Sequence, residues 1–181
     1  MTTDAKGPLA LAGAAAGAMI DGVRDDQWSA PTPCEGWTVA DLVQHLVQGN
    51  LGFVRALGGA VETASTPDRR AAYHASLAAL LDAFGRPGVL EETVTVPFGS
   101  VPGAAALHLR VTELLVHAWD LARATGQTLD VSPELAEQEL SFSRAKLLQL
   151  PPDRSPFGPP QPIAEDAPAM DRLAALLGRR P

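Results

Sequence analysis

The segment Glu113-Leu-Leu-Val-His117 places a carboxylate and an imidazole four residues apart, within a largely apolar run from residue 111 to residue 122. Residues with this spacing share one face of an α-helix. A helix that is buried on its other sides should not carry two ionisable groups without partners. A divalent metal is one partner that would satisfy both groups, and it would require at least one further ligand from elsewhere in the chain.

The residues around this segment predict a series of helices. Thr38 can cap a helix in which Asp41 returns a hydrogen bond to the Thr38 amide, and Gly58-Gly59 would end that helix. Similar start and stop signals recur along the chain. The expected helices span about 8–24, 38–57, 66–84, 103–124 and 133–150, and a short one follows Asp166 and stops at Gly178.

The connecting segments have their own signals. The sequence Glu92-Thr-Val-Thr-Val-Pro97 alternates β-branched residues and predicts a short edge strand or an extended connector. Six prolines between residues 151 and 162 predict a Pro-rich loop over about 151–165. The Ala- and Gly-rich run 8–20 is too weakly hydrophobic for a signal peptide, so we expect a first amphipathic helix there. Together these elements predict an all-α helix bundle, antiparallel or with a crossover, as one domain over 1–181.

Composition excludes several classes of function. The net charge of -7 argues against a nucleic-acid partner or an anionic membrane surface. No apolar stretch approaches the roughly 20 residues needed to cross a bilayer. The single cysteine, Cys34, excludes an intrachain disulfide framework and a Cys-rich zinc site. We therefore expect a cytoplasmic protein without nucleic-acid or membrane partners, although an exposed apolar helix face could support a homodimer.

A third metal ligand has to come from another helix, because metal sites in bundles are built from inward side chains on facing helices. His45 lies in the second expected helix, on its apolar side, so the economical set is His45, Glu113 and His117. His108 would lie on the opposite side of the helix from His117, and His74 belongs to a more polar helix and should face solvent. The alternative is that the spacing of Glu113 and His117 is accidental and the histidines are ordinary core residues.

Further polar residues lie near this set. Asp41 and Asp120 could each accept a hydrogen bond that fixes an imidazole tautomer, although Asp41 is more simply a capping residue. Trp37 and Trp119 are expected to fill core or pocket wall.

The remaining candidates are a cysteine and two arginines. Cys34 has no base beside it and Glu35 opposes thiolate formation, so we expect a role in packing or turn geometry. Arg123 is next to the proposed metal face and could bind an anionic ligand or cofactor. For Arg110 we expect solvent exposure.

The segment Trp28-x3-Pro-Thr-Pro-Cys-Glu-Gly-Trp-Thr-Val-Ala-Asp-Leu-Val-Gln-His45, taken with Glu113-Leu-Leu-Val-His117-Ala-Trp-Asp-Leu-Ala-Arg-Ala-Thr-Gly126, is similar to a known family. These motifs resemble the actinobacterial DinB-like metal-binding proteins related to the N-terminal domain of mycothiol-dependent maleylpyruvate isomerase. The closing segments from Phe157 and from Leu177 resemble members of one subfamily.

The resemblance implies a DinB-like four-helix bundle with a crossover connection. It also implies a divalent metal held by His45, Glu113 and His117, and thiol-dependent transfer, isomerisation or ring opening with mycothiol or another low-molecular-weight thiol. The isomerase has a further C-terminal domain that contributes to its active site, whereas this chain ends soon after the bundle. The resemblance therefore supports the metal site better than it supports maleylpyruvate as a substrate.

Several functions remain open on the sequence. Two histidines and one carboxylate suit zinc and also match non-haem Fe(II), and nickel is a further candidate. The enzymatic hypothesis is a thiol S-transferase or isomerase that acts on an electrophilic substrate, with a metal-dependent hydrolase as a variant. One alternative is a bundle that binds metal or a small ligand without turnover. Another is a structural domain in which Glu113 and His117 pair with each other.

Overall fold

The computed structural model describes residues 6–61, 66–96, 99–149 and 157–181. Within these residues the chain forms six α-helices, one short 3₁₀ helix and one β-hairpin. The elements are α1 (Lys6–Asp21), η1 (Asp25–Gln27), α2 (Val39–Ala56), α3 (Arg69–Phe84), β1 (Thr93–Val96), β2 (Gly99–Pro102), α4 (Gly103–Thr125), α5 (Pro133–Leu147) and α6 (Ala169–Leu176).

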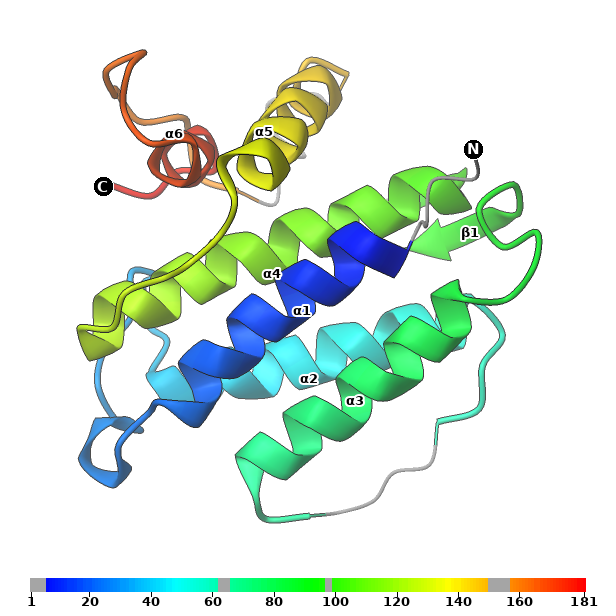
Figure 1. Cartoon of the computed structure of the whole chain (residues 1–181), viewed down its shortest axis with the longest axis horizontal. Helices are drawn as coiled ribbons and strands as arrows, with labels where there is room; N and C mark the ends of the chain where they lie inside the picture. The colour runs from blue at the N-terminus through cyan, green and yellow to red at the C-terminus, as the bar shows by residue number, and fades with distance from the viewer. Residues whose placement is uncertain (1–5, 62–65, 97–98, 150–156) are drawn as a thin grey trace.

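Helices α1 to α4 form a bundle in which each helix packs on two others. Helix α1 contacts α3 and α4, and α2 contacts the same two helices from the other side, so the chain crosses the bundle between α1 and α2. Helices α5 and α6 pack on each other and on α4, on the side of the bundle away from α3 (Figure 1). The all-α fold predicted from the sequence is therefore confirmed.

The local signals around α2 act as predicted. The hydroxyl of Thr38 accepts a hydrogen bond from the amide of Asp41, and the Asp41 carboxylate accepts one from the amide of Thr38. This reciprocal capping box fixes where the helix begins. The position of Asp41 as a capping residue is confirmed, and the helix that it starts carries His45 toward α4.

Helix α4 is the most buried element of the bundle because α1, α2, α5 and α6 all pack against it. It ends where Gly126 adopts a left-handed conformation with φ of 71°, which glycine enters without the strain that a side chain would cause. Burial on nearly every side explains why its polar residues require partners inside the protein.

Several boundaries differ from those expected. Helix α3 is capped by the side chain of Asp68 and begins at Arg69, later than the expected start at residue 66. Pro168 likewise lies at the cap of α6, and α5 ends at Leu147. The extended segment predicted near residues 92–97 pairs as β1 with an unpredicted antiparallel partner, β2. The expected proline-rich loop falls partly on residues 150–156, outside the described residues, and residues 157–168 contain no helix or strand.

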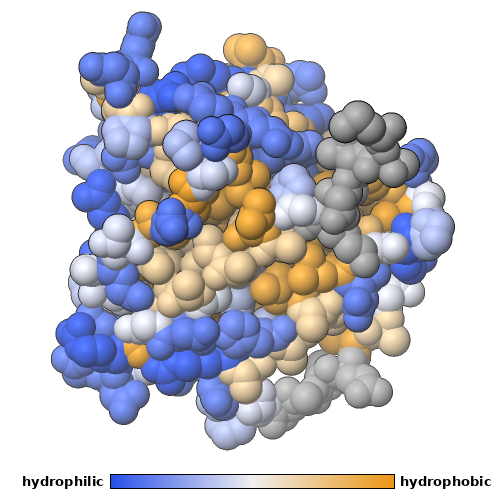
Figure 2. Space-filling view, viewed as in Figure 1, coloured by the Kyte–Doolittle hydropathy of each residue, from blue (hydrophilic) through white to orange (hydrophobic). Residues whose placement is uncertain are grey.

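The surface of α1 is weakly apolar. Figure 2 shows a band of weakly hydrophobic and hydrophobic residues across the middle of the face over α1, where Leu11 is 60% exposed beside Ala14 and Ala18. The homodimer considered above stays a prediction. Among the described helices none combines the length and the apolar character needed to span a membrane.

Candidate functional site

Three side chains predicted to bind metal meet between α2 and α4. The Nε2 atom of His45, on α2, lies 2.8 Å from the Oε1 atom of Glu113 on α4. His117 follows one turn later on α4, and the ligand atoms of all three residues lie within 4.8 Å of one another. The rings of His45 and His117 meet edge to face with centroids 5.1 Å apart. We call these three residues the triad.

A buried arginine holds the carboxylate of the triad. Arg110 donates to Oε2 of Glu113 over 2.7 Å, while its other nitrogens donate to Oδ1 of Asn50 and to the carbonyl of Leu46. No part of Arg110 is exposed. The expectation that Arg110 is solvent-exposed is therefore wrong. The physical reason is that α4 is packed on almost every side, so its arginine has to find acceptors in the core.

The protonation state of Glu113 follows from these contacts. Burial opposes its ionisation, but the charge of Arg110 and the hydrogen bond from His45 outweigh that effect and hold the pKa of Glu113 well below its usual range. Glu113 is therefore an ionised carboxylate with one oxygen bonded to Arg110 and the other facing His45. The alternative in which Glu113 simply pairs with His117 does not match these contacts.

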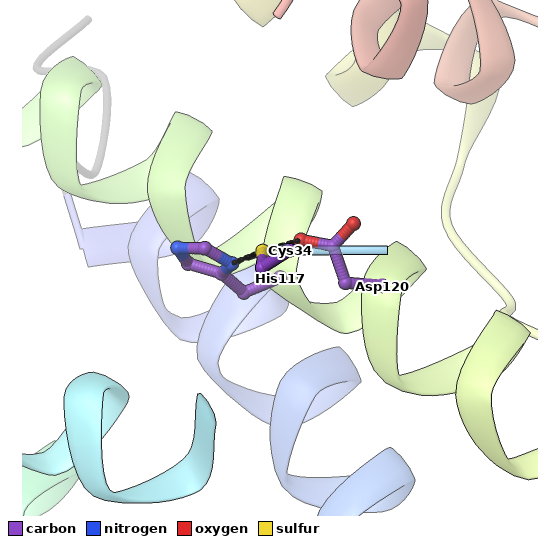
Figure 3. A group of neighbouring side chains, drawn as sticks. All are labelled: Cys34, His117 and Asp120. Carbon is purple, nitrogen blue, oxygen red and sulfur yellow. Dashed lines mark hydrogen bonds and ion pairs between the residues drawn. The ribbon is translucent and has the colours of Figure 1, made fainter. Parts of the chain in front are cut away.

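The imidazole of His117 is oriented by Asp120. Its Nδ1 atom lies 3.0 Å from Oδ2 of Asp120, which is fully buried, and the other ring nitrogen points away from that carboxylate (Figure 3). Burial lowers the pKa of His117 although Asp120 acts in the opposite direction. A neutral imidazole that donates from Nδ1 leaves a lone pair on Nε2, the atom available to a metal. The sequence suggested this role for Asp120.

A second cluster shares His117 with the triad. Cys34, His117 and Asp120 also bring their ligand atoms within 4.8 Å of one another (Figure 3). The guanidinium of Arg179 already occupies this cluster, since it donates to both oxygens of Asp120 at 3.2 and 2.9 Å and approaches the Cys34 sulfur at 3.4 Å. A cation bound beside this guanidinium would be repelled, so this cluster does not fit a metal.

Cys34 donates its thiol proton to Asp120 over 3.2 Å. Burial, reinforced by the charge of Asp120, raises the pKa of Cys34 to about 11. The thiol is therefore protonated at neutral pH and acts as a hydrogen-bond donor. The role in packing or turn geometry expected for Cys34 stays a prediction, and no local sequence pattern indicated that His117 and Arg179 lie beside the thiol.

The triad does fit a metal by its donor chemistry. It offers the ionised carboxylate of Glu113, the neutral imidazole of His117 and a second imidazole on His45, which is the donor set found for zinc and for non-haem Fe(II). The side chains of His45 and Glu113 are 35% and 24% exposed, so the group is reachable from outside. Arg110 and Asp120 fix the carboxylate and one imidazole from behind, as ligands of metal sites commonly require.

The triad lines a cavity of about 760 Å³, within the range of roughly 300–1,000 Å³ typical of small-molecule sites. Its wall is largely apolar and comes from several elements of the chain. The aromatic and aliphatic part of the wall includes Trp37, Phe53, Leu109, Phe142, Leu147 and Phe157. Trp37 forms pocket wall and Trp119 is buried in the core, and both positions agree with the expectation of core or pocket wall.

The other candidate residues lie elsewhere. Arg123, suggested for an anionic ligand, does not line the cavity, and it pairs with Asp171 at 3.5 Å while lying over the ring of Trp119. His108 pairs with Glu139 at 2.8 Å, away from the triad, as its helical position predicted. His74 is exposed, which confirms the prediction for that residue.

Sequence reasoning missed the residues that support the triad. Arg110 lies three residues before Glu113, and that spacing in an apolar helix was a usable signal for an ion pair. Arg179 lies 59 residues from Asp120, and no local pattern connects the two.

The chain is similar to one protein family and to two bacterial proteins. Residues 9–122 match the family model described as the mycothiol maleylpyruvate isomerase N-terminal domain. The uncharacterized proteins MT0763 and Rv0738 of Mycobacterium tuberculosis are each 42% identical to the chain over 164 residues, which is 90% of this chain and 90% of theirs.

Two solved structures share the fold. The crystal structure of the mycothiol-dependent maleylpyruvate isomerase matches with a TM-score of 0.63 at 17% identity, over 80% of this chain and 68% of that one. A histidine-to-alanine mutant of that isomerase matches with the same TM-score at 16% identity. The family match covers more than half of the chain, from α1 through most of α4, and includes all three triad residues. The chain therefore belongs to the mycothiol maleylpyruvate isomerase N-terminal domain family.

Proposed function

We propose that this protein binds a divalent metal through His45, Glu113 and His117 and uses the site to activate a low-molecular-weight thiol such as mycothiol. The observation that carries this proposal is the approach of the three ligand atoms to within 4.8 Å of one another at the wall of a cavity. Membership of a mycothiol isomerase family supports the choice of thiol. The reaction class is transfer or isomerisation that begins with attack of the thiol on an electrophilic substrate.

The chemistry that a divalent metal supplies at such a site is a lowered pKa for a bound thiol, which gives a thiolate at neutral pH. The protein prepares the site before any ligand arrives. Arg110 keeps Glu113 ionised and fixes its rotamer, while Asp120 keeps the Nε2 atom of His117 unprotonated. Ligands held in this way need little reorganisation, which favours both affinity and rate.

The cavity wall sets the properties of the second reactant. The rings of Phe53, Phe142 and Phe157 line the cavity. An apolar wall of this kind accommodates a small electrophile with a substantial hydrocarbon part.

Zinc is the metal that we propose, because two imidazoles and one carboxylate with open positions are typical of catalytic zinc. Iron and nickel tolerate the same donors, so the identity of the metal is decided by elemental analysis.

A second candidate is a bundle that binds metal and a small ligand without turnover. It is favoured by the polar groups of the cavity wall, several of which are already bonded to other protein groups. Thr112 donates to Glu139 over 2.9 Å, and Arg179 is bonded to Asp120. The hydrolase variant would need, in addition, a general base near the triad.

Elemental analysis of the purified protein tests the metal site. We expect near-stoichiometric metal in the wild type and in His74→Ala, an exposed-histidine control, and a large loss in His117→Ala. Circular dichroism establishes that each variant is folded. Unchanged metal content in folded His117→Ala would refute the site.

A thiol-consumption assay then separates the two candidates. Metal-loaded protein is incubated with mycothiol and a panel of apolar electrophiles, and free thiol is followed with time. Catalysed consumption that is lost in His117→Ala supports the enzyme. Stoichiometric metal without any acceleration over the protein-free reaction supports the binding protein instead.

A further inference from the structure

We propose that Arg179, in the C-terminal segment, is a positioning residue that fixes the tautomer of His117 through Asp120 and so prepares the metal site. The inference deepens the proposed function and rests on it only where metal affinity is measured. Arg179 lies outside the part of the chain that matches the family model, residues 9–122.

The contacts of Arg179 are those of a residue with a fixed position. Its Nε atom donates to Oδ1 of Asp120 over 3.2 Å and one terminal nitrogen donates to Oδ2 over 2.9 Å, so the ion pair is bidentate. Its remaining nitrogen donates to the carbonyl of Leu177 over 2.9 Å, and the side chain is only 11% exposed. Such paired bonds orient a carboxylate more strictly than a single charge does.

Backbone geometry directs Arg179 to this place. Gly178 has φ of 89°, and a Cβ atom there would lie 2.9–3.0 Å from the backbone of Gly158. Only glycine allows both the left-handed conformation and this close crossing of two chain segments. The crossing follows the end of α6 and turns the next side chain into the cluster of Asp120 and Cys34.

Asp120 transmits this orientation to His117. Its Oδ2 atom accepts from Arg179, from Nδ1 of His117 at 3.0 Å and from the thiol of Cys34 at 3.2 Å. The carboxylate is fully buried, so no water replaces a lost donor without rearrangement. With Arg179 in place, the carboxylate plane is set and Nδ1 of His117 is the donor, which leaves Nε2 for a metal.

Hydrogen bonds therefore connect Arg179 in the C-terminal segment, through Asp120, to His117 of the triad. Without Arg179 the carboxylate of Asp120 is free to rotate about its side chain, and His117 loses the constraint that selects one tautomer. We expect a mixed tautomer population in the metal-free protein and weaker metal binding of about tenfold, the lower end of what supporting residues of metal ligands contribute.

The primary test reads the tautomer in metal-free protein by long-range ¹H–¹⁵N NMR of ¹⁵N-histidine-labelled samples, with His117 assigned from the His117→Ala spectrum. The measurement is made at about pH 8, where imidazoles are largely neutral. We expect the Nδ1–H form in the wild type and in Arg180→Gln, which changes the adjacent exposed arginine. In Arg179→Gln we expect loss of that single form. In Arg179→Lys we expect a partial loss, because lysine cannot form the bidentate interaction with Asp120.

A control separates positioning from undocking of α6. Asp171 on α6 accepts from the indole of Trp119 over 2.7 Å, so Asp171→Asn loosens α6 while leaving Arg179 intact, and the Trp119 indole resonance reports docking. A change of the His117 tautomer in Arg179→Gln that exceeds the change in Asp171→Asn supports the proposal. A tautomer in Arg179→Gln that matches either the wild type or Asp171→Asn overturns it.

Zinc affinity, measured by competition with a chelator, supplies the second readout. We expect a loss of about tenfold in Arg179→Gln and no change in Arg180→Gln. If the wild type binds no zinc, the proposed function fails while the tautomer result still decides the role of Arg179.

Discussion

The guanidinium of Arg110 donates to Oε2 of Glu113 over 2.7 Å from a position with no exposed surface. The same guanidinium is anchored on Asn50 of α2, whose amide in turn donates to Ser76 of α3 over 2.9 Å. One buried network thus ties the carboxylate of the triad to three helices of the bundle. A change at Arg110 or Glu113 should therefore alter both the stability of the bundle and the geometry of the triad.

The first prediction concerns loss of that pair. Arg110→Met should lower the free energy of unfolding by about 3–5 kcal/mol, because the buried Oδ1 of Asn50 and one oxygen of the partly buried Glu113 carboxylate lose their donor. Urea denaturation measures the change. The control is Arg123→Met, which removes an exposed pair with Asp171 and should cost about 1 kcal/mol or less. Equal losses in the two variants would contradict the argument.

Metal should stabilise the folded protein through the triad. Zinc at about 100 times its dissociation constant should raise the free energy of unfolding by about 2.7 kcal/mol, because the triad is assembled only in the folded chain. The measurement is the shift of the melting temperature with and without zinc. His45→Ala should abolish the shift and His74→Ala should retain it. A zinc-induced shift that persists in folded His45→Ala would show that the metal binds elsewhere.

A pH dependence of stability is expected from His108. Its hydrogen bond to Glu139, the largest influence, raises the pKa of His108 above the ordinary value. A raised pKa means that the folded state binds the proton more tightly, so this stabilisation is complete below the unfolded-state pKa of about 6.5. It is then lost as the pH rises through the folded-state pKa.

The corresponding measurement is urea denaturation of the wild type and of His108→Gln across this range. The wild type should exceed the variant most at the acidic end, and the difference should shrink as the pH rises above about 6.5. A difference that is constant with pH would show that the pair contributes only by packing, for instance through the stacking of His108 on Phe142.

Cys34 should be unreactive despite its place at the cavity wall. With a pKa of about 11, its thiolate fraction at neutral pH is roughly a hundredfold below that of a free cysteine. Iodoacetamide should therefore label folded protein about a hundredfold more slowly than urea-unfolded protein. The two rates are compared by mass spectrometry under identical reagent. Labelling of the folded chain at the unfolded rate would show that the thiol is not held as a donor to Asp120.

The sequence predicted the local features of this structure. The capping box of Thr38 and Asp41 fixed the start of α2, and the spacing of Glu113 and His117 placed both on one face of α4. The resemblance of the motifs pointed to His45 as the third member of the triad. The glycine at 126 marked the end of α4 because a left-handed residue was needed there.

Other features had no local signal. Strand β2 reads Gly-Ser-Val-Pro, which has no alternation to predict, and it forms only because β1 supplies its hydrogen-bonding partner. The expectation for Arg110 was wrong because arginine is usually exposed, whereas helix packing enclosed α4 on nearly every side.

Capping and helical periodicity act over a few neighbouring residues, so the amino-acid sequence alone predicted the main helices, the start of α2 and the shared face of Glu113 and His117, but not every helix boundary. The contact of His45 with Glu113, 68 positions apart, and that of Arg179 with Asp120, 59 positions apart, arise only when the chain is folded. Those contacts depend on how whole helices pack, and packing is set by the summed burial of many side chains rather than by any short pattern.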